Sequence, residues 1–288
     1  MNAQLGMWIF WQYQQAGKGR LSVKSVEVTP AVWNRLLQVR DGINCTCCGD
    51  WSAGEKAALD LYGPLARRDV GELTIGQIGQ SLDGRIATSN GDSKDVSGPN
   101  GFEHLHRLRA LVDGVVIGVK TALHDSPRLT VRHCEGPNPA RVVIDPNGRL
   151  PDDSPVLEAN GARRILIQAV NQKRPEGVEV IKLEADQGQF HPESIISALQ
   201  DAGLKHILIE GGGYTIGKFI DQNLLGRLHI AIAPLIIGSG ANGLTLSEQG
   251  PNLQDAIRPD TSAFSLGSDV VFDCALMAEA QASHNPMH

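Results

Sequence analysis

The sequence predicts an α/β fold with a mostly parallel central sheet. Short runs rich in Val, Ile and Leu recur from Leu73 onward, and many are continuously apolar, as in strands covered on both faces. Helical segments separate several of these runs, which is the order typical of βαβ units. The last two runs are joined by a loop without a helix, so we expect antiparallel strands at one edge of the sheet.

About eight segments carry the strand pattern. In order along the chain they read LTIGQI, VDGVVIGV, RVVID, RRILIQAV, VEVIKL, KHILIE, LHIAIAPLII and DVVFDCAL. The segments between them predict helices at about 101–111, 192–202 and 214–222, where apolar residues recur at helical spacing.

Residues 1–70 differ in character from residues 71–280. We expect them to form a small N-terminal extension of unknown role, packed on or tethered to one larger domain. Its segments TPAVWNRLLQVRDG and SAGEKAALDLYGPLARR each open with a Thr or Ser that can cap a helix. No catalytic pattern is present in either segment.

The composition excludes several classes of function. A formal net charge of −6 and a pI of about 5.8 argue against a general nucleic-acid binder, which carries a basic surplus. The apolar run at residues 7–11 is too short for a secretory core, and no stretch approaches the roughly 18 apolar residues of a membrane span. We expect a cytoplasmic protein that binds neither nucleic acid nor membrane.

Three of the five cysteines, Cys45, Cys47 and Cys48, crowd into one CTCC segment. An odd number of clustered cysteines does not match a secreted disulfide framework. A structural zinc site normally needs four ligands in separated pairs, and no second Cys or His pair follows at a suitable spacing. We therefore predict reduced thiols and no metal site, with metal or redox use as the alternative.

The segment LIEGGGYTIGKFI, residues 208–220, joins an apolar run to a helical one through Glu210 and three glycines. Glycines let a backbone approach a ligand closely, and the first turn of a helix favours an anion. The loop is therefore a candidate cradle for a diphosphate, although it is neither a G-x-G-x-x-G fingerprint nor a Walker loop. A tight strand-to-helix connection is the alternative.

Other polar residues follow the expected strands. Ser81 and Asp83 lie in a turn after the first strand, where they could line the same sheet edge or simply make a turn. A basic helix and a polar loop come next, and a solvated face is the alternative for the helix. The residues in question are His104, Arg107, Arg109, Thr121, Asp125 and Arg132.

Together, the segments SLDGRIA, residues 91–132, LIEGGGYTIGKFI and LHIAIAPLIIG resemble the reductase domain of the bifunctional riboflavin biosynthesis deaminase/reductase family. The resemblance runs in order from about 73 to 275. It implies a three-layer fold like that of dihydrofolate reductase. It also implies an NADPH-dependent enzyme that reduces the ribosyl group of a phosphorylated aminopyrimidine to a ribityl chain.

The resemblance also implies roles for individual residues. It places Thr121 and Asp125 at the cofactor. The diphosphate and ribose loop would comprise Gly212, Gly213, Tyr214, Thr215, Ile216 and Gly217. The positions in contact with substrate would be Ser93, Arg109, Leu129, Arg132 and Glu210.

These residue types suit the chemistry. An arginine fork donates two hydrogen bonds to phosphate oxygens, so Arg109 and Arg132 are candidates for the 5′-phosphate. Glu210 can accept hydrogen bonds from ribose hydroxyls or pyrimidine amino groups. Hydride transfer depends mainly on orientation, and Asp125 is the candidate to stabilise an iminium or relay a proton.

The chain departs from the family pattern in three places. Residues 1–70 lack the H-x-E and P-C-x-x-C elements that hold zinc in the deaminase half, so we expect no deamination. Asp95 stands where the bacterial family commonly has a tryptophan, which could change the substrate. The CTCC segment has no counterpart in the family domain.

Three alternatives stay open. The chain could be a paralogue that reduces another pterin-like or pyrimidine-like compound, or a non-catalytic nucleotide-binding scaffold. The coenzyme could be NADH, since Lys173 and Arg174 are candidates for a 2′-phosphate but also suit a solvated loop. Relatives form dimers, so we expect a homodimer with the strand near 230–237 at its interface.

Overall fold

The computed structural model describes residues 21–43, 45–247 and 252–277. The apolar run at residues 7–11 and the last residues of the expected domain, 278–280, lie outside the described residues. Among the described helices, none is long and apolar enough to cross a membrane.

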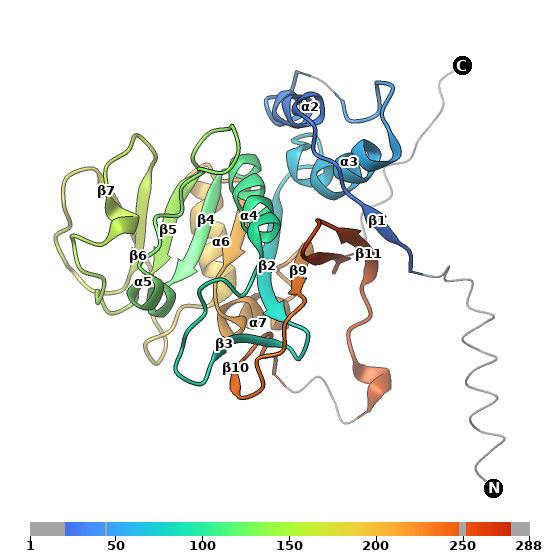
Figure 1. The fold of residues 1–288 in the computed structure, drawn as a ribbon. Coiled ribbons are helices and arrows are strands. Elements are labelled where there is room, and N and C mark those ends of the chain that lie inside the picture. Colours follow the sequence, from blue (N-terminus) through green and yellow to red (C-terminus); the bar gives the residue numbers. More distant parts are fainter. Residues whose placement is uncertain (1–20, 44, 248–251, 278–288) are drawn as a thin grey trace, which may run out of the picture.

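A ten-stranded sheet forms the middle of the protein (Figure 1). In spatial order its strands are β1 (Val23–Ser25), β11 (Asp260–Ser265), β12 (Val270–Ala275), β9 (Arg227–Ala233), β2 (Leu73–Ser81), β8 (His206–Glu210), β4 (Gly114–Gly118), β5 (Ala140–Ile144), β6 (Arg164–Gln168) and β7 (Val178–Lys182). β12 runs antiparallel to both β11 and β9, and all other neighbouring strands are parallel. The expected α/β class with antiparallel strands toward one edge is confirmed.

Helices cover both faces of the sheet and make three layers. Their bounds are α2 (Pro30–Arg40), α3 (Ala53–Ala66), α4 (Pro99–Leu111), α5 (Val119–Asp125), α6 (Pro192–Asp201) and α7 (Gly213–Asp221), with single 3-10 turns at Pro155–Leu157 and Leu253–Asp255. Apolar residues of α2 to α5 share one core with the sheet, and those of α6 and α7 share the other. Strand residues alternate between the cores, as Val115 and Val116 of β4 do, because successive side chains point to opposite faces.

A second, two-stranded sheet lies beside the carboxyl ends of the central strands. It pairs β3 (Arg85–Thr88) with β10 (Gly240–Asn242) in antiparallel register. Gly240 sits so close to β3 that a Cβ atom there would lie 2.0 Å from the carbonyl oxygen of Ala87. The ribbon therefore holds two loops that are far apart in sequence against each other.

The N-terminal extension is packed on the domain. Thr29 caps α2 by accepting a hydrogen bond from the Val32 amide, and Ser52 with Glu55 forms a capping box at the start of α3. Trp33 of α2 donates its indole N–H to the carbonyl oxygen of Glu135 at 2.9 Å. The extension also contributes β1 to the central sheet. It therefore supplies one strand of the sheet as well as two helices that pack on it.

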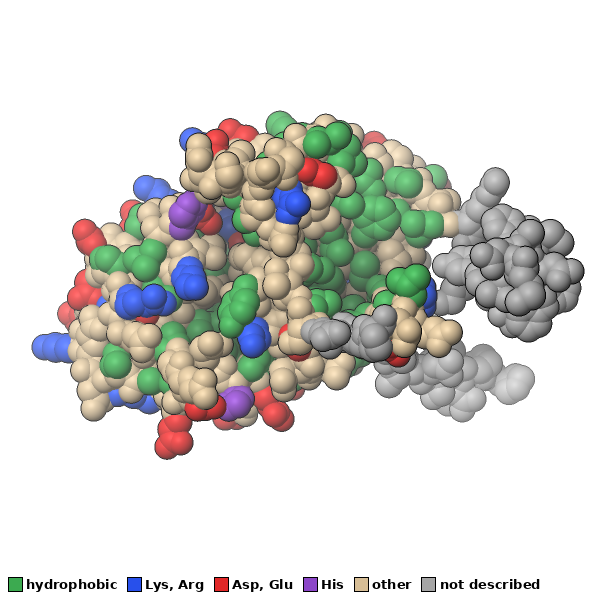
Figure 2. All heavy atoms as spheres, turned by 90° about the horizontal axis from the view of Figure 1, so that it is seen from below, with side chains coloured by type: hydrophobic (Ala, Val, Ile, Leu, Met, Phe, Trp, Pro, Cys, Tyr) green, Lys and Arg blue, Asp and Glu red, His purple; other side chains and the backbone are tan. Residues whose placement is uncertain are grey.

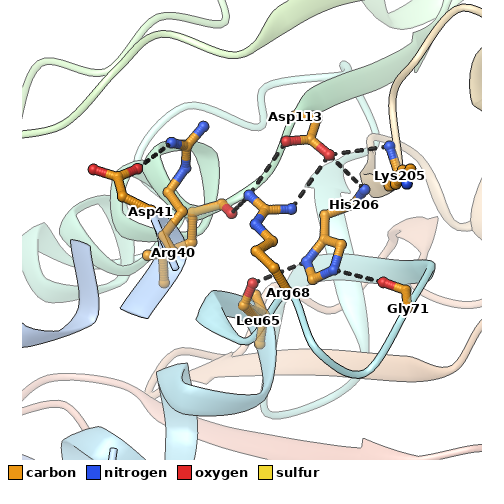
Figure 3. Close-up of polar contacts among 9 residues, drawn as sticks. Arg40, Asp41, Leu65, Arg68, Gly71, Asp113, Lys205 and His206 are labelled. Atoms are coloured by element: carbon orange, nitrogen blue, oxygen red, sulfur yellow. Dashed lines mark hydrogen bonds and ion pairs between the residues drawn. The ribbon is translucent and has the colours of Figure 1, made fainter. Parts of the chain in front are cut away.

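A polar junction joins the extension to the sheet (Figure 3). Asp113 accepts hydrogen bonds from the backbone amide of His206, at 2.8 Å, and from the guanidinium of Arg68, at 3.2 Å. The two ring nitrogens of His206 lie 3.0 Å from the carbonyl oxygens of Leu65 and Gly71. These contacts fix the chain where it passes from α3 into β2.

A buried polar chain crosses the core beneath α4. The Tyr62 hydroxyl lies 2.9 Å from Nδ1 of His104, whose Nε2 lies 3.3 Å from the ring of His229. His229 is in turn 3.3 Å from Asp273, which accepts two hydrogen bonds from Arg227. Burial holds the pKa of His104 well below its ordinary value, so this ring is neutral. His104 is therefore a core residue and not part of a solvated helix face.

Candidate active site

A pocket of about 550 Å³ opens at the carboxyl ends of β2, β8 and β4. In parallel α/β sheets this is the usual place for a ligand. Figure 2 views the side on which β3, β10 and α7 lie, and there hydrophobic side chains occupy the hollowed middle of the face with charged ones mostly around them. The expected site residues Ser93, Thr121, Asp125, Glu210 and Gly212 all line this pocket.

Glycines of the loop after β8 are required for two different steric reasons. Gly213 and Gly217 lie against residues 243–245, since a Cβ atom at either would come within 2.0 Å of a backbone oxygen of that segment. Gly211 has a φ of +120°, a conformation that L side chains rarely adopt. A Cβ atom at Gly212 would instead meet nothing within 4 Å, because this residue faces the open pocket.

Helix α5 supplies a polar wall of the pocket. Thr121 lies next to the glycine loop, with its hydroxyl 3.2 Å from where a Cβ atom of Gly211 would be. Asp125, at the end of the helix, lies 2.7 Å from Nδ1 of His124. Lys120 also lines the pocket, so an ammonium and a carboxylate five residues apart on α5 belong to the same wall.

Glu210 closes β8 and is held by Arg109 of α4. The two guanidinium nitrogens Nε and Nη2 of Arg109 each donate to one carboxylate oxygen at 2.8 Å, and both side chains are only 8% exposed. Arg109 also donates to the carbonyl oxygen of Thr130 at 3.3 Å. Glu210 therefore faces the pocket with its orientation fixed by a bidentate ion pair from behind.

The loop after α5 has an unusual backbone. Ser126 and Leu129 have φ values of +45° and +53°, in the left-handed region that costs a bulky residue about 1–2 kcal/mol. Leu129 is buried, whereas Arg132 is exposed and bonds to the Thr130 hydroxyl at 2.5 Å. The loop thus leads from the buried Arg109 ion pair to a second, exposed arginine.

Positive charge gathers around Arg132. Burial, together with the neighbouring charges of Arg109 and Arg128, lowers the pKa of Arg132. The backbone amide of Arg132 donates to Nδ1 of His106 at 2.9 Å. Burial, together with the charges of Arg109 and Arg132, lowers the pKa of His106 to about 3. Two of these arginines already face a carboxylate, Arg109 with Glu210 and Arg128 with Glu158 at 3.9 Å. Among the described residues Arg132 has no such partner, so it is the arginine of this group that suits a phosphate dianion.

The turn after β2 is a structural anchor. The carboxylate of Asp83 accepts hydrogen bonds from the Ser81 hydroxyl at 2.5 Å and from the backbone amides of Ile237 and Gly238 at 3.1 and 2.7 Å. The Ser81 bond and these two amides lower the pKa of Asp83 to about 2. The turn therefore fixes the loop that follows β9, and neither residue lines the pocket.

The remaining residues of the expected diphosphate loop point elsewhere. The Tyr214 hydroxyl donates to Gln189 at 3.0 Å, and the Ile216 side chain is fully buried in the core. The Thr215 hydroxyl lies near Gly118, 3.3 Å from where its Cβ atom would be. None of these three side chains lines the pocket, and the Ile216 side chain is closed off in the core.

Sequence reasoning missed several residues of the pocket wall. Gln77 of β2 is 7% exposed, and its side-chain oxygen has no hydrogen-bond partner among the described residues. Phe102 of α4, Lys120 and His124 line the pocket as well. A glutamine inside the apolar run LTIGQI was the one visible sign, because buried polar groups normally have partners.

Two suggestions about surface residues are corrected. Arg174 is buried and paired with Asp145 and Asp152 at 3.3 and 2.8 Å, so it does not lie in a solvated loop. Asp95 is exposed with a φ of +65° and is not among the residues that line the pocket. The exchange of tryptophan for Asp95 therefore adds no acidic group to the pocket lining.

The RibD C-terminal domain model matches residues 74–272. A 2,5-diamino-6-ribosylamino-4(3H)-pyrimidinone 5′-phosphate reductase of Methanothermobacter thermautotrophicus is 30% identical over 67% of this chain and 93% of its own length. RibD of Aquifex aeolicus is 32% identical over 56% of this chain, and the match spans only 46% of that relative.

Solved structures agree in fold. RibD of Acinetobacter baumannii has a TM-score of 0.64 at 21% identity, covering 78% of this chain and 64% of that one. The deaminase/reductase of Thermotoga maritima has a TM-score of 0.61 at 25% identity, covering 77% of this chain and 62% of that one. Since the family model covers most of the sheet and every strand that borders the pocket, the chain belongs to the RibD C-terminal domain family.

Proposed function

We propose that this protein is an NADPH-dependent reductase that converts the ribosyl group of a 5-amino-6-(5-phosphoribosylamino)pyrimidine to a ribityl chain. One observation carries the proposal. An open glycine at a helix N-terminus, Gly212, lines the same pocket as Thr121 and Asp125 of α5 and Glu210 of β8. The names of the matched relatives supply the class of substrate.

The pocket fits a nicotinamide coenzyme. Gly212 leaves open space at the N-terminus of α7, where the first backbone amides of a helix have no partner within it. Gln77 adds a buried acceptor that has no partner among the described residues and suits a ligand N–H. A bound coenzyme would supply the hydride.

The protein's own residues would orient the substrate and manage its charge. Glu210 is an acceptor for ribose hydroxyls or a pyrimidine amino group, and the Arg109 fork keeps its carboxylate aimed at the pocket. Asp125 is the carboxylate on the α5 wall and can stabilise a developing iminium or relay a proton. Ser93 faces them from the loop after β3.

The direct test is turnover by purified protein. We expect oxidation of NADPH with the phosphoribosylaminopyrimidine in its amino or its oxo form, and weaker use of NADH. Coenzyme binding without turnover of either form would favour a paralogue with another pyrimidine-like or pterin-like substrate. Failure to bind either coenzyme would contradict the reductase and favour the scaffold.

Replacing Asp125 with asparagine should lower kcat by about 10²- to 10⁴-fold, the usual contribution of a positioned acid or base. Coenzyme affinity, measured by fluorescence titration, should stay within a few-fold of the parent protein. Asp201→Asn, the same change at an exposed residue of α6 outside the pocket, is the matched control. Full kcat in Asp125→Asn with intact coenzyme binding would remove Asp125 from the mechanism.

Arg132 is the better candidate for the substrate phosphate, because Arg109 is already occupied by Glu210. Arg132→Gln should raise KM by about 10- to 100-fold with little change in kcat, since a charged hydrogen bond contributes about 1.5–3 kcal/mol. The variant and the parent should differ little on the dephosphorylated compound. An equal loss on both compounds would show that Arg132 does not bind the phosphate.

A cytoplasmic homodimer is the remaining part of the proposal and rests on the resemblance to the family. Light scattering coupled to size exclusion tests the dimer, because the single chain has a mass of 30.9 kDa. A species near that mass at micromolar concentration would contradict it.

A further inference from the structure

Three thiols converge in the loop between α2 and α3. Sγ of Cys47 lies 3.0 Å from Sγ of Cys45 and 3.7 Å from Sγ of Cys48, and all three sulfur atoms lie within 4.8 Å of one another. None of the three is in a disulfide. The loop belongs to the extension, whereas every residue that lines the pocket comes from beyond position 76.

Contacts with neighbouring residues hold the loop in this shape. The Arg35 guanidinium donates to the carbonyl oxygens of Cys45 and Cys48, at 3.2 and 2.7 Å, and lies 5.4 Å from the ring of Trp51. The Trp51 indole donates to the same Cys48 carbonyl at 3.1 Å. These bonds all use the loop's backbone, so the thiol groups are left for each other and for a ligand.

Thr46 lies between the cysteines and packs the other way. Its methyl group approaches α3, 3.2 Å from where a Cβ atom of Gly63 would lie. Within the CTCC segment, the Thr46 side chain therefore packs against α3, whereas the three sulfur atoms lie together on the more exposed side of the loop. The loop is therefore preorganised in the absence of a ligand, as a specific binding site requires.

The spacing of the sulfur atoms suits one metal ion. With metal–sulfur bonds of about 2.3 Å, sulfur atoms around one ion are about 3.8 Å apart in tetrahedral geometry and about 4.0 Å apart in a plane. Two of the sulfur separations here are 3.0 and 3.7 Å and the third is at most 4.8 Å. Movements of the sulfur atoms by about one ångström would therefore complete the site. Among the described residues, no His, Asp, Glu or further Cys joins this group.

The donor set selects the class of ion. Three thiolates are soft ligands, which favour monovalent copper and zinc over harder ions such as magnesium or calcium. Zinc in a closed structural site takes four protein ligands, and the described residues offer three. A monovalent d¹⁰ ion can be satisfied by three sulfur atoms alone, so copper(I) fits this set without a further ligand.

We propose that Cys45, Cys47 and Cys48 form a binding site for one copper(I) ion, held by three thiolates and positioned by Arg35. Each thiol that binds releases one proton to solvent, and no change of oxidation state occurs. The site is separate from the pocket, so the protein's reductase chemistry does not depend on its occupancy. The sequence alone favoured unoccupied thiols because four separated ligands are not present.

The test is anaerobic titration of the full chain with copper(I) against a chromogenic copper(I) chelator. We expect one tightly held equivalent, accompanied by ultraviolet thiolate-to-metal absorption and by protection of three thiols from a thiol reagent. Cys47→Ser should weaken binding by at least about 100-fold, more than the loss of a supporting hydrogen bond costs at metal sites. Cys134→Ser, the same change at a cysteine outside the loop, should leave the titration unchanged.

Arg35→Gln tests the positioning role. It leaves all three thiols in place, so the copper stoichiometry should stay at one while affinity falls by about 10- to 100-fold. Equal copper affinity in Cys47→Ser and the parent would overturn the site. Stoichiometric zinc binding in a parallel titration, with copper(I) no better held, would overturn the three-coordinate assignment. Circular dichroism of each variant shows whether the fold is kept.

Discussion

Gly213→Ala should destabilise the protein by at least about 3 kcal/mol, at the upper end of what overpacking costs. A Cβ atom there would lie 1.5 Å from the carbonyl oxygen of Gly243 and 2.4 Å from its carbon. Both are backbone atoms, so no side-chain rotation relieves the clash. The segment 243–245 would have to leave the surface of α7, and the β10 ribbon that precedes it would move as well.

Gly212→Ala is the matched control one residue earlier. Its φ of −64° and ψ of 151° suit alanine, and the added methyl group meets nothing within 4 Å. We expect its free energy of unfolding, from denaturant titration, to lie within about 0.5 kcal/mol of the parent. Its methyl group enters the pocket, so coenzyme affinity should fall. A Gly213→Ala protein as stable as the parent would show that residues 243–245 do not rest on α7.

Glu210→Gln should cost stability and activity together. It leaves the Arg109 guanidinium buried without its counter-charge, and breaking such a pair costs about 3–5 kcal/mol. The glutamine keeps one acceptor oxygen, so we expect a loss near about 3 kcal/mol in denaturant titration. kcat/KM should fall as well, because Glu210 lines the pocket.

A double variant, Arg109→Met with Glu210→Leu, separates the two effects. Replacing a buried pair by apolar residues of similar volume is often neutral or stabilising, so stability should return while activity does not. If the free energy of unfolding of the single variant Glu210→Gln lies within about 1 kcal/mol of the parent, the ion pair is solvated like a surface salt bridge and is not buried.

The central strands could be predicted because their apolar runs are long enough to stand out. β4, β6 and β8 are buried almost throughout, and helices separate them in sequence. β1 and β11 could not be predicted in the same way. β1 is three exposed residues, and β11 carries Asp, Thr and Ser, so each is a strand only because its partner lies beside it.

Individual residues of the site could be predicted from the sequence, but the contacts between them could not. The motifs that resemble the family named residues that do line the pocket, and Gly211 and Gly212 line it whereas Gly213 packs against residues 243–245. The ion pair between Arg109 and Glu210 joins residues 101 positions apart, so nothing local in the sequence could reveal that one expected phosphate ligand is already engaged. The three sulfur atoms were adjacent in sequence, but their convergence depends on Arg35 and Trp51.

The pairing of β1 with β11 also affects the order in which the strands can pair during synthesis of the protein. The strands β4 to β7 follow one another along the chain and can pair soon after they leave the ribosome. β2 must wait for β8 and β9, and β1 must wait until residues 260–265 have been made. β1 is thus the first described strand in sequence and among the last to gain its partner, whereas α2 and α3 can already pack on α4.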